Sequence, residues 1–172
     1  MLIRNAKRSD LRHIAEIYDN AYDEIKYNQD FGDYLRLKRP KMDNIQKWER
    51  NVYNDILNKN AIFLVALENE QVVGFCFVRK KDIPDSEISH VGILGIRIIK
   101  EFRKKGLGTK LVSRILKESK GKFEIIEVEV MAVNKTSKAL FNKFNFKKWG
   151  TAPRYVKRGK KYIDLEYMYL KL

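Results

Sequence analysis

The sequence predicts a single α+β domain with helices packed on a mixed sheet, and the first observation behind this is the order of the patterns. Strand-like and helix-like patterns follow one another as β-α-α-β-β-β-α-β-α-β-β. Second, no internal repeat, low-complexity tract or Pro/Ser-rich linker divides the 172 residues. Third, 44% hydrophobic and 12% aromatic residues are enough for a core and exclude a disordered chain.

The first part of the chain predicts a short strand and two helices. Residues 2–6, LIRNA, form the strand, and Ser9 is expected to cap the first helix. The second helix begins near Asp43, where Asp43 and Gln46 resemble a capping box. The apolar residues at helical spacing are Leu11, Ile14, Ala15, Tyr18, Ala21, Tyr22 and Ile25 in the first helix and Ile45, Trp48, Val52 and Ile56 in the second.

The middle of the chain predicts a hairpin and a buried strand. Residues 61–81 contain two apolar runs around a turn at residues 68–70, which is typical of a β-hairpin. Residues 82–87, DIPDSE, are expected to form a loop. Residues 88–99 are almost all apolar, which indicates a strand that is buried on both faces.

The last part predicts a helix, a strand, a short helix and two final strands. Gly121 is expected as the C-cap of the helix that follows residues 101–111. Residues 123–131 form a strand, and Thr136 or Ser137 caps the next helix. The two final strands are separated by a turn around Pro153. The stripe of the longer helix is Leu107, Leu111, Val112, Ile115 and Leu116.

Composition bounds the class of protein. One cysteine, Cys76, excludes an internal disulfide and, with two histidines, offers no zinc-binding spacing, so no metal is expected and a reducing compartment is favoured. The N-terminal ten residues have no apolar signal core. The most apolar run, residues 91–99, is too short to span a bilayer and contains Arg97. We therefore expect a cytoplasmic protein without a membrane partner.

The net charge of +14 raises the question of nucleic acid. Basic residues are dispersed, however, and many alternate with Asp and Glu. We therefore do not expect nucleic acid as the primary ligand.

Residues 101–111, EFRKKGLGTKL, place basic residues and two glycines before a helical pattern. A Rossmann fingerprint that starts at Gly106 and Gly108 would need a third small residue where Leu111 stands. A P-loop from Gly106 would need lysine where Val112 stands, so both motifs are excluded. A glycine turn before a helix still suits a pyrophosphate. Taken alone, an anion site and a solvated basic turn stay equally open.

Two segments resemble the GNAT superfamily of N-acetyltransferases. Arg-x-x-Gly-x-Gly at residues 103–108, after the buried strand, resembles the family's acetyl-CoA signature. Residues 133–146, VNKTSKALFNKFNF, are similar to its second segment at Asn134, Ser137, Leu140, Phe141 and Phe146. The order of elements matches as well. The resemblance implies one GNAT domain over residues 1–172, in α/β/α layers, whose mixed and mostly antiparallel sheet splays into a V-shaped cofactor cleft.

The resemblance implies an acetyl-CoA-dependent N-acetyltransferase, in which a primary amine of a small molecule or protein attacks acetyl-CoA directly in a ternary complex and CoA is released. Backbone groups of Ile96, Arg97 and Ile98 would bind the pantetheine, with an N–H near Ile98 at the thioester oxygen. Asn134 would also bind this arm. Lys143 would contact the ribose phosphate or adenine, and an exposed helical lysine is an equal alternative. The residues implied for the pyrophosphate are Arg103, Lys104, Lys105, Gly106, Leu107, Gly108 and Thr109.

The chain departs from the family at two positions. The tyrosine proposed to protonate the CoA thiolate is replaced by Phe141, which can still pack on the pantetheine. The proton would come from water, Tyr155 or Tyr162. Asn145 replaces a glycine, a mild change because Asn tolerates the left-handed conformation.

Glu129 is the candidate base, because an attacking amine must be neutral. Glu127 shares its strand face, and a pair of salt-bridged edge carboxylates is the alternative. His90, at the start of the preceding strand, is a second candidate base, although a lone histidine there is more often structural. The acceptor wall is expected at Tyr22, Tyr27, Phe31 and Tyr34, from the position of the corresponding family residues.

The sequence leaves the acceptor amine open, and the family allows a homodimer. Two other functions also stay open. The first is an acyl-CoA-binding or regulatory protein with weak or no transfer, which only Phe141 supports. The second is acetylation of ribosomal or other nucleic-acid-associated proteins, which the net charge suggests.

Overall fold

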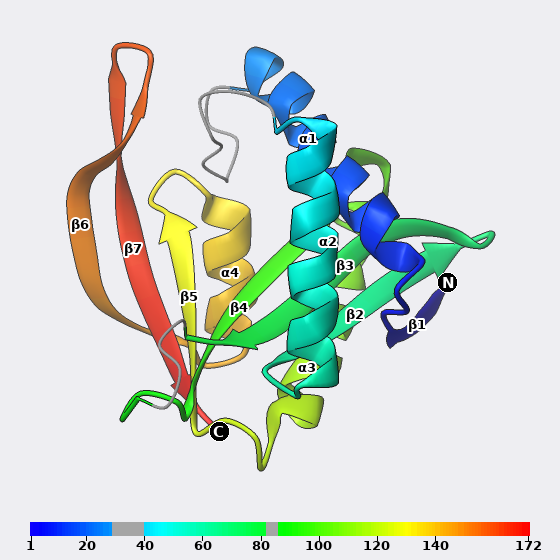
Figure 1. Ribbon diagram of the computed structural model, residues 1–172. Coiled ribbons are helices and arrows are strands. Elements are labelled where there is room, and N and C mark those ends of the chain that lie inside the picture. The colour runs from blue at the N-terminus through cyan, green and yellow to red at the C-terminus, as the bar shows by residue number, and fades with distance from the viewer. Residues whose placement is uncertain (29–39, 82–85) are drawn as a thin grey trace.

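A computed structural model describes residues 1–28, 40–81 and 86–172. Within these ranges seven strands form one sheet in the order β1-β2-β3-β4-β5-β7-β6 (Figure 1). Neighbouring strands are antiparallel except for β4 and β5, which are parallel. The predicted α+β fold with a mixed, mostly antiparallel sheet is confirmed.

The order of elements is also as predicted. Among the described residues, no helix is long and apolar enough to cross a membrane. The elements are β1 Leu2–Asn5, α1 Asp10–Tyr27, α2 Met42–Leu57, β2 Ala61–Glu68, β3 Gln71–Lys80, β4 Val91–Ile98, a 3-10 turn Lys100–Phe102, α3 Leu107–Ser119, β5 Ile125–Met131, α4 Lys135–Lys143, β6 Lys147–Arg158 and β7 Lys161–Lys171.

Helices cover both faces of the sheet, in the three layers expected. Residues of α1 and α2, such as Leu11 and Val52, pack with Phe75 on one face. Residues of α3 and α4, such as Leu111 and Phe141, form the larger core on the other face. All five stripe positions of α3 are buried, because a helix with one apolar face hides that face against the sheet.

Several local predictions about caps are wrong. Ser9 has helical backbone angles and makes no side-chain capping bond to the described residues. Asp10, the first residue of the helix, makes the polar contacts at this end: its Oδ2 accepts the N–H of Lys7, which precedes the helix, at 2.6 Å and pairs with Arg4 at 2.6 Å. Burial alone would raise the pKa of Asp10, but the bonds from Arg4 and Lys7 outweigh it and lower that pKa.

The second helix begins at Met42, with Lys41 as its N-cap and no capping bond from a described side chain, so the capping box at Asp43 does not form. Of the helix ends, Gly121 is close to its predicted place. It follows the C-cap Lys120 with φ of +75°, the left-handed conformation that glycine favours.

The turn predicted at Pro153 is wrong, because β6 runs through it to Arg158 and the chain reverses at Gly159 and Lys160. Pro153 lies where the β6–β7 register shifts, between Ala152 and Val156. Proline, which has no N–H, is tolerated at such a bulge in an edge strand. The hairpin predicted at residues 68–70 is confirmed, with its turn at positions 69 and 70.

Candidate active site

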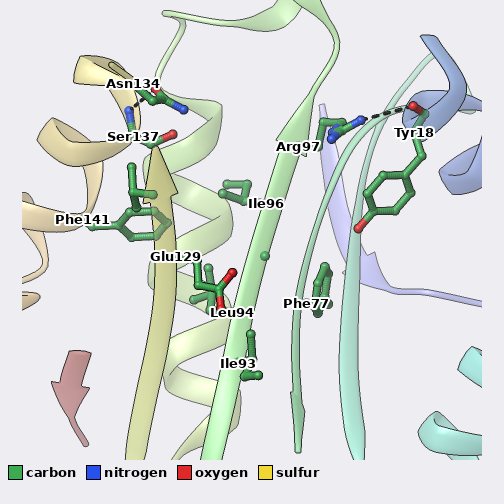
Figure 2. Close-up of a pocket in the computed structure, with 12 residues that line it drawn as sticks. Tyr18, Phe77, Ile93, Leu94, Ile96, Arg97, Glu129, Asn134, Ser137 and Phe141 are labelled. Atoms are coloured by element: carbon green, nitrogen blue, oxygen red, sulfur yellow. Dashed lines mark hydrogen bonds between the residues drawn. The ribbon is translucent and has the colours of Figure 1, made fainter. Parts of the chain in front are cut away.

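The parallel strands β4 and β5 pair over only part of their length. The ladder runs from Val91 opposite Ile125 to Ile93 opposite Glu127, while β4 continues to Ile98 and β5 to Met131. Figure 2 shows the two strands diverging from the level of Ile93 upward. This is the predicted V-shaped opening. A cavity of about 240 Å³ lies there, lined by Tyr18, Phe77, Ile93, Leu94, Gly95, Ile96, Arg97, Glu129, Val130, Asn134, Ser137 and Phe141.

The register of β4 decides which of its backbone groups face this opening. The carbonyl of Val91 accepts the N–H of Lys81, and the N–H of Ile99 donates to the carbonyl of Val73. In an antiparallel ladder hydrogen-bonded pairs alternate with non-bonded ones, so every second residue of β4 turns its N–H and C=O toward β3.

Ile96 and Ile98 therefore turn their backbone groups toward the cleft, and their binding of the pantetheine stays a prediction. The backbone of Arg97, opposite Phe75 in the ladder, faces β3 instead. The predicted contact between the Arg97 backbone and the pantetheine does not fit this register, because the N–H and C=O of Arg97 point toward β3 and away from the cleft.

The side chain of Arg97 forms part of the opposite wall of the cavity. It is only 7% exposed; its Nη1 donates to the carbonyl of Tyr18 at 3.3 Å, and its Cζ lies 4.6 Å from the centre of the Tyr18 ring. Burial lowers the pKa of Arg97. Burial of the hydroxyl raises the pKa of Tyr18 to about 12, so Tyr18 stays protonated at neutral pH. Sequence reasoning placed Tyr18 in the core.

Gly95 leaves room for the ring of Phe77 on the α1 face of β4. A Cβ at Gly95 would lie 2.4 Å from that ring. The side chains of Ile93 and Arg97 share the α1 face of β4, whereas Leu94 belongs to the core on the α3 face. The cavity therefore reaches both faces of the sheet through the split.

The predicted pyrophosphate loop has the backbone of an anion cradle. Lys104 and Gly106 have φ of +58° and +78°, and α3 begins directly afterwards at Leu107. Gly106 is the N-cap and has no side chain to cap the first-turn N–H groups. Gly108 allows close packing, since a Cβ there would lie 3.3 Å from the Leu140 side chain. Thr109 follows in the first turn.

The side chain of Arg103 does not point to a phosphate. Its Nε donates to the carbonyl of Ile98 at 2.7 Å. Its Nη1 and Nη2 donate to the two carboxylate oxygens of Glu24 in α1, the second at 2.8 Å. Arg103 therefore ties the loop to β4 and α1, and its contact with the pyrophosphate stays a prediction. The exposed Lys104 and Lys105 are the remaining cationic side chains of this segment.

The second resemblance segment forms α4. Its N-cap is Asn134, not Thr136 or Ser137, because the Asn134 Oδ1 accepts the N–H of Ser137 at 2.9 Å (Figure 2). Phe141 is 4% exposed, packs on Phe146 with ring centres 5.2 Å apart, and lines the cavity.

Two further residues flank α4. Lys143 is exposed in its last turn and does not line the cavity. Asn145 has φ of +63°, the left-handed conformation expected for the residue that replaces glycine.

The two carboxylates on β5 have different surroundings. Glu129 lines the cavity (Figure 2). Glu127 pairs with Lys81 at 2.7 Å, so the alternative of a salt-bridged carboxylate is correct for Glu127. Glu129 lies on the α1 face, because Val128 and Val130 belong to the α3 core. It therefore shares a face with Arg97.

The structure does not bring His90 to the cavity. His90 lies in the turn before β4, which begins at Val91, three residues after the start of the predicted strand at residue 88. Its carbonyl accepts the N–H of Glu124 at 2.9 Å, and the residue borders a different hollow with Phe123 and Leu172. That hollow is at the closed end of the V.

Tyr155 lies on β6 and is 57% exposed, within hydrogen-bonding reach of Tyr167. Tyr167 is the ladder partner of Glu129, so their side chains leave the same face as neighbours. Partial burial, followed by the neighbouring Tyr155 and Glu129, raises the pKa of Tyr167. Tyr162 is instead covered by Arg154, whose Cζ lies 4.2 Å from its ring centre.

Sequence reasoning missed Tyr167, although a tyrosine opposite the Glu129 strand follows from pairing two alternating patterns. Of the expected acceptor wall, Tyr22 is half-buried on α1. Phe31 and Tyr34 lie outside the described residues, as does the side chain of Tyr27.

Comparison with known proteins agrees with this geometry. The model of the acetyltransferase (GNAT) family matches residues 18–146. The N-alpha-acetyltransferase of Saccharolobus solfataricus is 33% identical over 95 residues, which are 50% of this chain and 56% of the relative, so the match spans about half of the relative's length.

Solved structures match over almost the whole chain. The N-acetyltransferase from Staphylococcus aureus Mu50 is 26% identical with a TM-score of 0.83, covering 99% of this chain and 97% of its own. The acetyltransferase yncA from Salmonella typhimurium, described as putative and solved with its cofactor acetyl-CoA, is 22% identical with a TM-score of 0.82, over 99% and 92%. At 22% identity, the similarity to yncA shows a shared fold alone. With three quarters of its length matched by the family model, this chain belongs to the acetyltransferase (GNAT) family.

Proposed function

We propose that the protein is an N-acetyltransferase that moves the acetyl group of acetyl-CoA to a primary amine by direct attack in a ternary complex. One observation carries the proposal: the open edge of β4 leads directly to the uncapped N-terminus of α3. An extended arm followed by a pyrophosphate, the shape of CoA, matches an open strand edge followed by an anion cradle.

Each part of acetyl-CoA has a counterpart in the chain. The first-turn N–H groups of α3, with Lys104 and Lys105, suit the pyrophosphate. The N–H of Ile98 and the carbonyl of Ile96 suit the amides of the pantetheine, since the carbonyl of Ile98 already accepts Arg103 Nε at 2.7 Å. Asn134 and Phe141, on the α4 side of the cavity, would border the same arm, and Lys143 stays a candidate for the ribose phosphate or adenine.

The acceptor would approach from the α1 face, where Tyr18, Arg97 and Glu129 line the cavity. Most alkyl amines are protonated at neutral pH, so attack requires loss of a proton. Glu129 would accept it, directly or through one water molecule. The N–H of Ile96, which lies closer than Ile98 to the level of Glu129, would stabilise the negative charge that develops on the thioester oxygen.

The CoA thiolate leaves as the new C–N bond forms. A thiolate is a good leaving group near neutral pH, so the lack of a hydroxyl at Phe141 does not prevent release. The proton taken from the amine returns to the thiolate through water or Tyr155. Tyr155 is linked toward Glu129 by Tyr167, which makes it the better of the two hydroxyl candidates, since Tyr162 lies five residues from Tyr167 along β7.

The relative from Saccharolobus solfataricus acts, by its name, on an α-amine, and we extend this to a polypeptide N-terminus as the acceptor. Cytoplasmic location and a homodimer stay predictions. Acetylation of a nucleic-acid-associated protein would be one case of this function.

The test combines binding with turnover. Titration calorimetry with acetyl-CoA should show saturable binding, and thiol release should follow when an amine panel, N-terminal peptides included, is added. The Glu129→Gln variant should keep its affinity for acetyl-CoA and lose turnover. Without saturable binding the proposal fails; binding without thiol release from any amine would favour the acyl-CoA-binding alternative that Phe141 suggests.

A further inference from the structure

Three aromatic residues of the C-terminal hairpin gather on the sheet face that also carries Glu129. Tyr167 on β7 is the ladder partner of Glu129 on β5, so both side chains leave the α1 face as neighbours. The ring centre of Trp149, on β6, lies 5.4 Å from that of Tyr167. Tyr155, also on β6, is within hydrogen-bonding reach of Tyr167. We call Trp149, Tyr155 and Tyr167 the aromatic surface.

Irregular pairing of β6 explains why two of its residues meet one residue of β7. The β6–β7 register shifts twice, between residues 148 and 150 and between residues 152 and 156. Trp149 lies in the first shift and Tyr155 in the second. An extra residue in one strand of a pair redirects side chains, and such bulges are frequent beside active sites. Both rings are thereby brought against Tyr167.

The aromatic surface is open to solvent although its side chains are large. Trp149 and Tyr155 are each 57% exposed, Tyr167 is half-buried, and Glu129 is exposed. The helices α1 and α2 cover β2 and β3, at the other end of the sheet from β6 (Figure 1). Exposed indole and phenol rings beside a reactive carboxylate provide apolar area that a ligand can cover.

The distance from Glu129 selects the part of the acceptor that would reach this surface. In the proposed function the amine lies at the Glu129 carboxylate. One strand spacing, about 5 Å, separates Glu129 from Tyr167, and two place Gly150, next to Trp149, at about 10 Å. In a polypeptide the first Cα is bonded to the amine nitrogen, so a large first side chain begins at Glu129 and extends across Tyr167 toward Trp149.

The chemistry of the surface favours an apolar group. Aromatic rings bind another ring or a large alkyl group through burial of apolar area and offset contacts. A small first side chain would leave the indole of Trp149 exposed, and an acidic one would be repelled by the Glu129 carboxylate.

We propose that Trp149, with Tyr155 and Tyr167, selects acceptors whose amine is attached to a carbon that bears a large apolar or aromatic side chain. A polypeptide that begins with phenylalanine, leucine or methionine is such an acceptor. The inference rests on the proposed function and specifies the acceptor of that same site.

The test compares three peptides that differ only in their first residue, which is phenylalanine, alanine or lysine. With the parent protein kcat/KM for the phenylalanine peptide should exceed that for the alanine peptide by about three- to tenfold, the value of one aromatic contact. Trp149→Ala should reduce this ratio to about twofold or less, and Trp149→Phe, which keeps a ring, should retain most of it. Because both peptides are measured on one sample, the amount of folded protein cancels in the ratio.

A control variant removes a similarly exposed apolar side chain elsewhere. Leu57, at the end of α2, is 60% exposed and does not line the cavity, so Leu57→Ala should keep the parent ratio.

Tryptophan fluorescence adds a readout that needs no turnover. The chain has two tryptophans, so the Trp48→Phe variant leaves Trp149 as the single one. With CoA in place of acetyl-CoA, no acetyl group is available for transfer. Saturating phenylalanine peptide should then shift the emission of Trp149 to shorter wavelength, because the indole loses contact with water.

Several results would overturn the inference and leave the proposed function standing. They are equal kcat/KM for the phenylalanine and alanine peptides, a preference that survives Trp149→Ala, and an emission that the phenylalanine peptide does not change. Higher kcat/KM for the lysine peptide would assign recognition to the carboxylates instead, and thiol release with other amines but with none of the peptides would exclude this class of acceptor. Failure to bind acetyl-CoA would instead defeat the proposed function, on which the inference rests.

Discussion

The ion pair between Glu24 and Arg103 joins the acceptor-side helix to the cofactor loop, and its removal separates two roles for Arg103. In the structure Arg103 positions the loop, because its guanidinium is bound by Glu24 and by the carbonyl of Ile98. The Glu24→Gln substitution should then loosen the loop. If Arg103 served instead as a charge for the pyrophosphate, the same substitution would release it toward the ligand.

The expected magnitude follows from the exposure of the pair. The side chains keep 33% and 21% exposure, which places them between a surface pair, worth about 0.2–1 kcal/mol, and a buried pair, whose disruption costs about 3–5 kcal/mol. We expect a loss of about 1–2 kcal/mol of unfolding free energy and a Tm lower by about 3–6 °C. If the ion pair contributes the same free energy to holding the loop in its binding conformation, the Kd of the Glu24→Gln variant for acetyl-CoA rises up to about tenfold.

The assay is a double-mutant cycle of Glu24→Gln and Arg103→Gln, measured by urea unfolding and by titration calorimetry with acetyl-CoA. A coupling energy of about 1 kcal/mol is expected in both. The reasoning would be refuted by a Glu24→Gln variant that binds acetyl-CoA as tightly as the parent or more tightly.

Three further perturbations test other parts of the structure. Glu129→Gln should reduce kcat about 10²-fold or more without weakening acetyl-CoA binding, and a parent-like rate would remove Glu129 as the base. Gly95→Ala should cost about 1–3 kcal/mol in urea unfolding, because its Cβ would lie 2.4 Å from the ring of Phe77; unchanged stability would contradict that contact. Because the folded-state pKa of Asp10 is lowered, its stabilisation is complete above the ordinary value of 3.8 and is lost as pH falls through the folded value. Asp10→Asn should therefore flatten the acid limb of a stability–pH curve, and an unchanged limb would exclude this linkage.

Periodic patterns predicted the fold well because they report burial directly. The stripe of α3 is buried at every position named, and the order of strands and helices was recovered. The helix caps were not predicted correctly, because each segment contains several polar side chains that could cap the helix. The backbone angles, which the sequence pattern does not give, determine which of them does. Asn134, not Ser137, caps α4 for this reason, and Ser9 makes no side-chain capping bond to the described residues of α1.

The parts of the candidate site that belong to the two sequence motifs were predicted, and the parts that depend on long-range packing were not. Asn134 lines the cavity at the split and the loop at Gly106 precedes α3, but the partner of Arg103 could not be predicted from its spacing. Glu24 lies 79 positions away, and only the packing of α1 brings the two together. The phase of Arg97 and the neighbourhood of Tyr167 likewise depend on strand register, which local patterns leave open.

Backbone amide exchange, resolved by residue with and without acetyl-CoA, tests most directly whether the split strand and the α3 N-terminus hold the donor. The N–H groups of Ile96 and Ile98, and those of residues 107–109, should exchange more slowly in its presence. The N–H of Arg97 is the internal control, because it bonds to β3 in both states and should not change. Unchanged exchange at Ile96 and Ile98 under saturating acetyl-CoA, with protection elsewhere, would contradict the account.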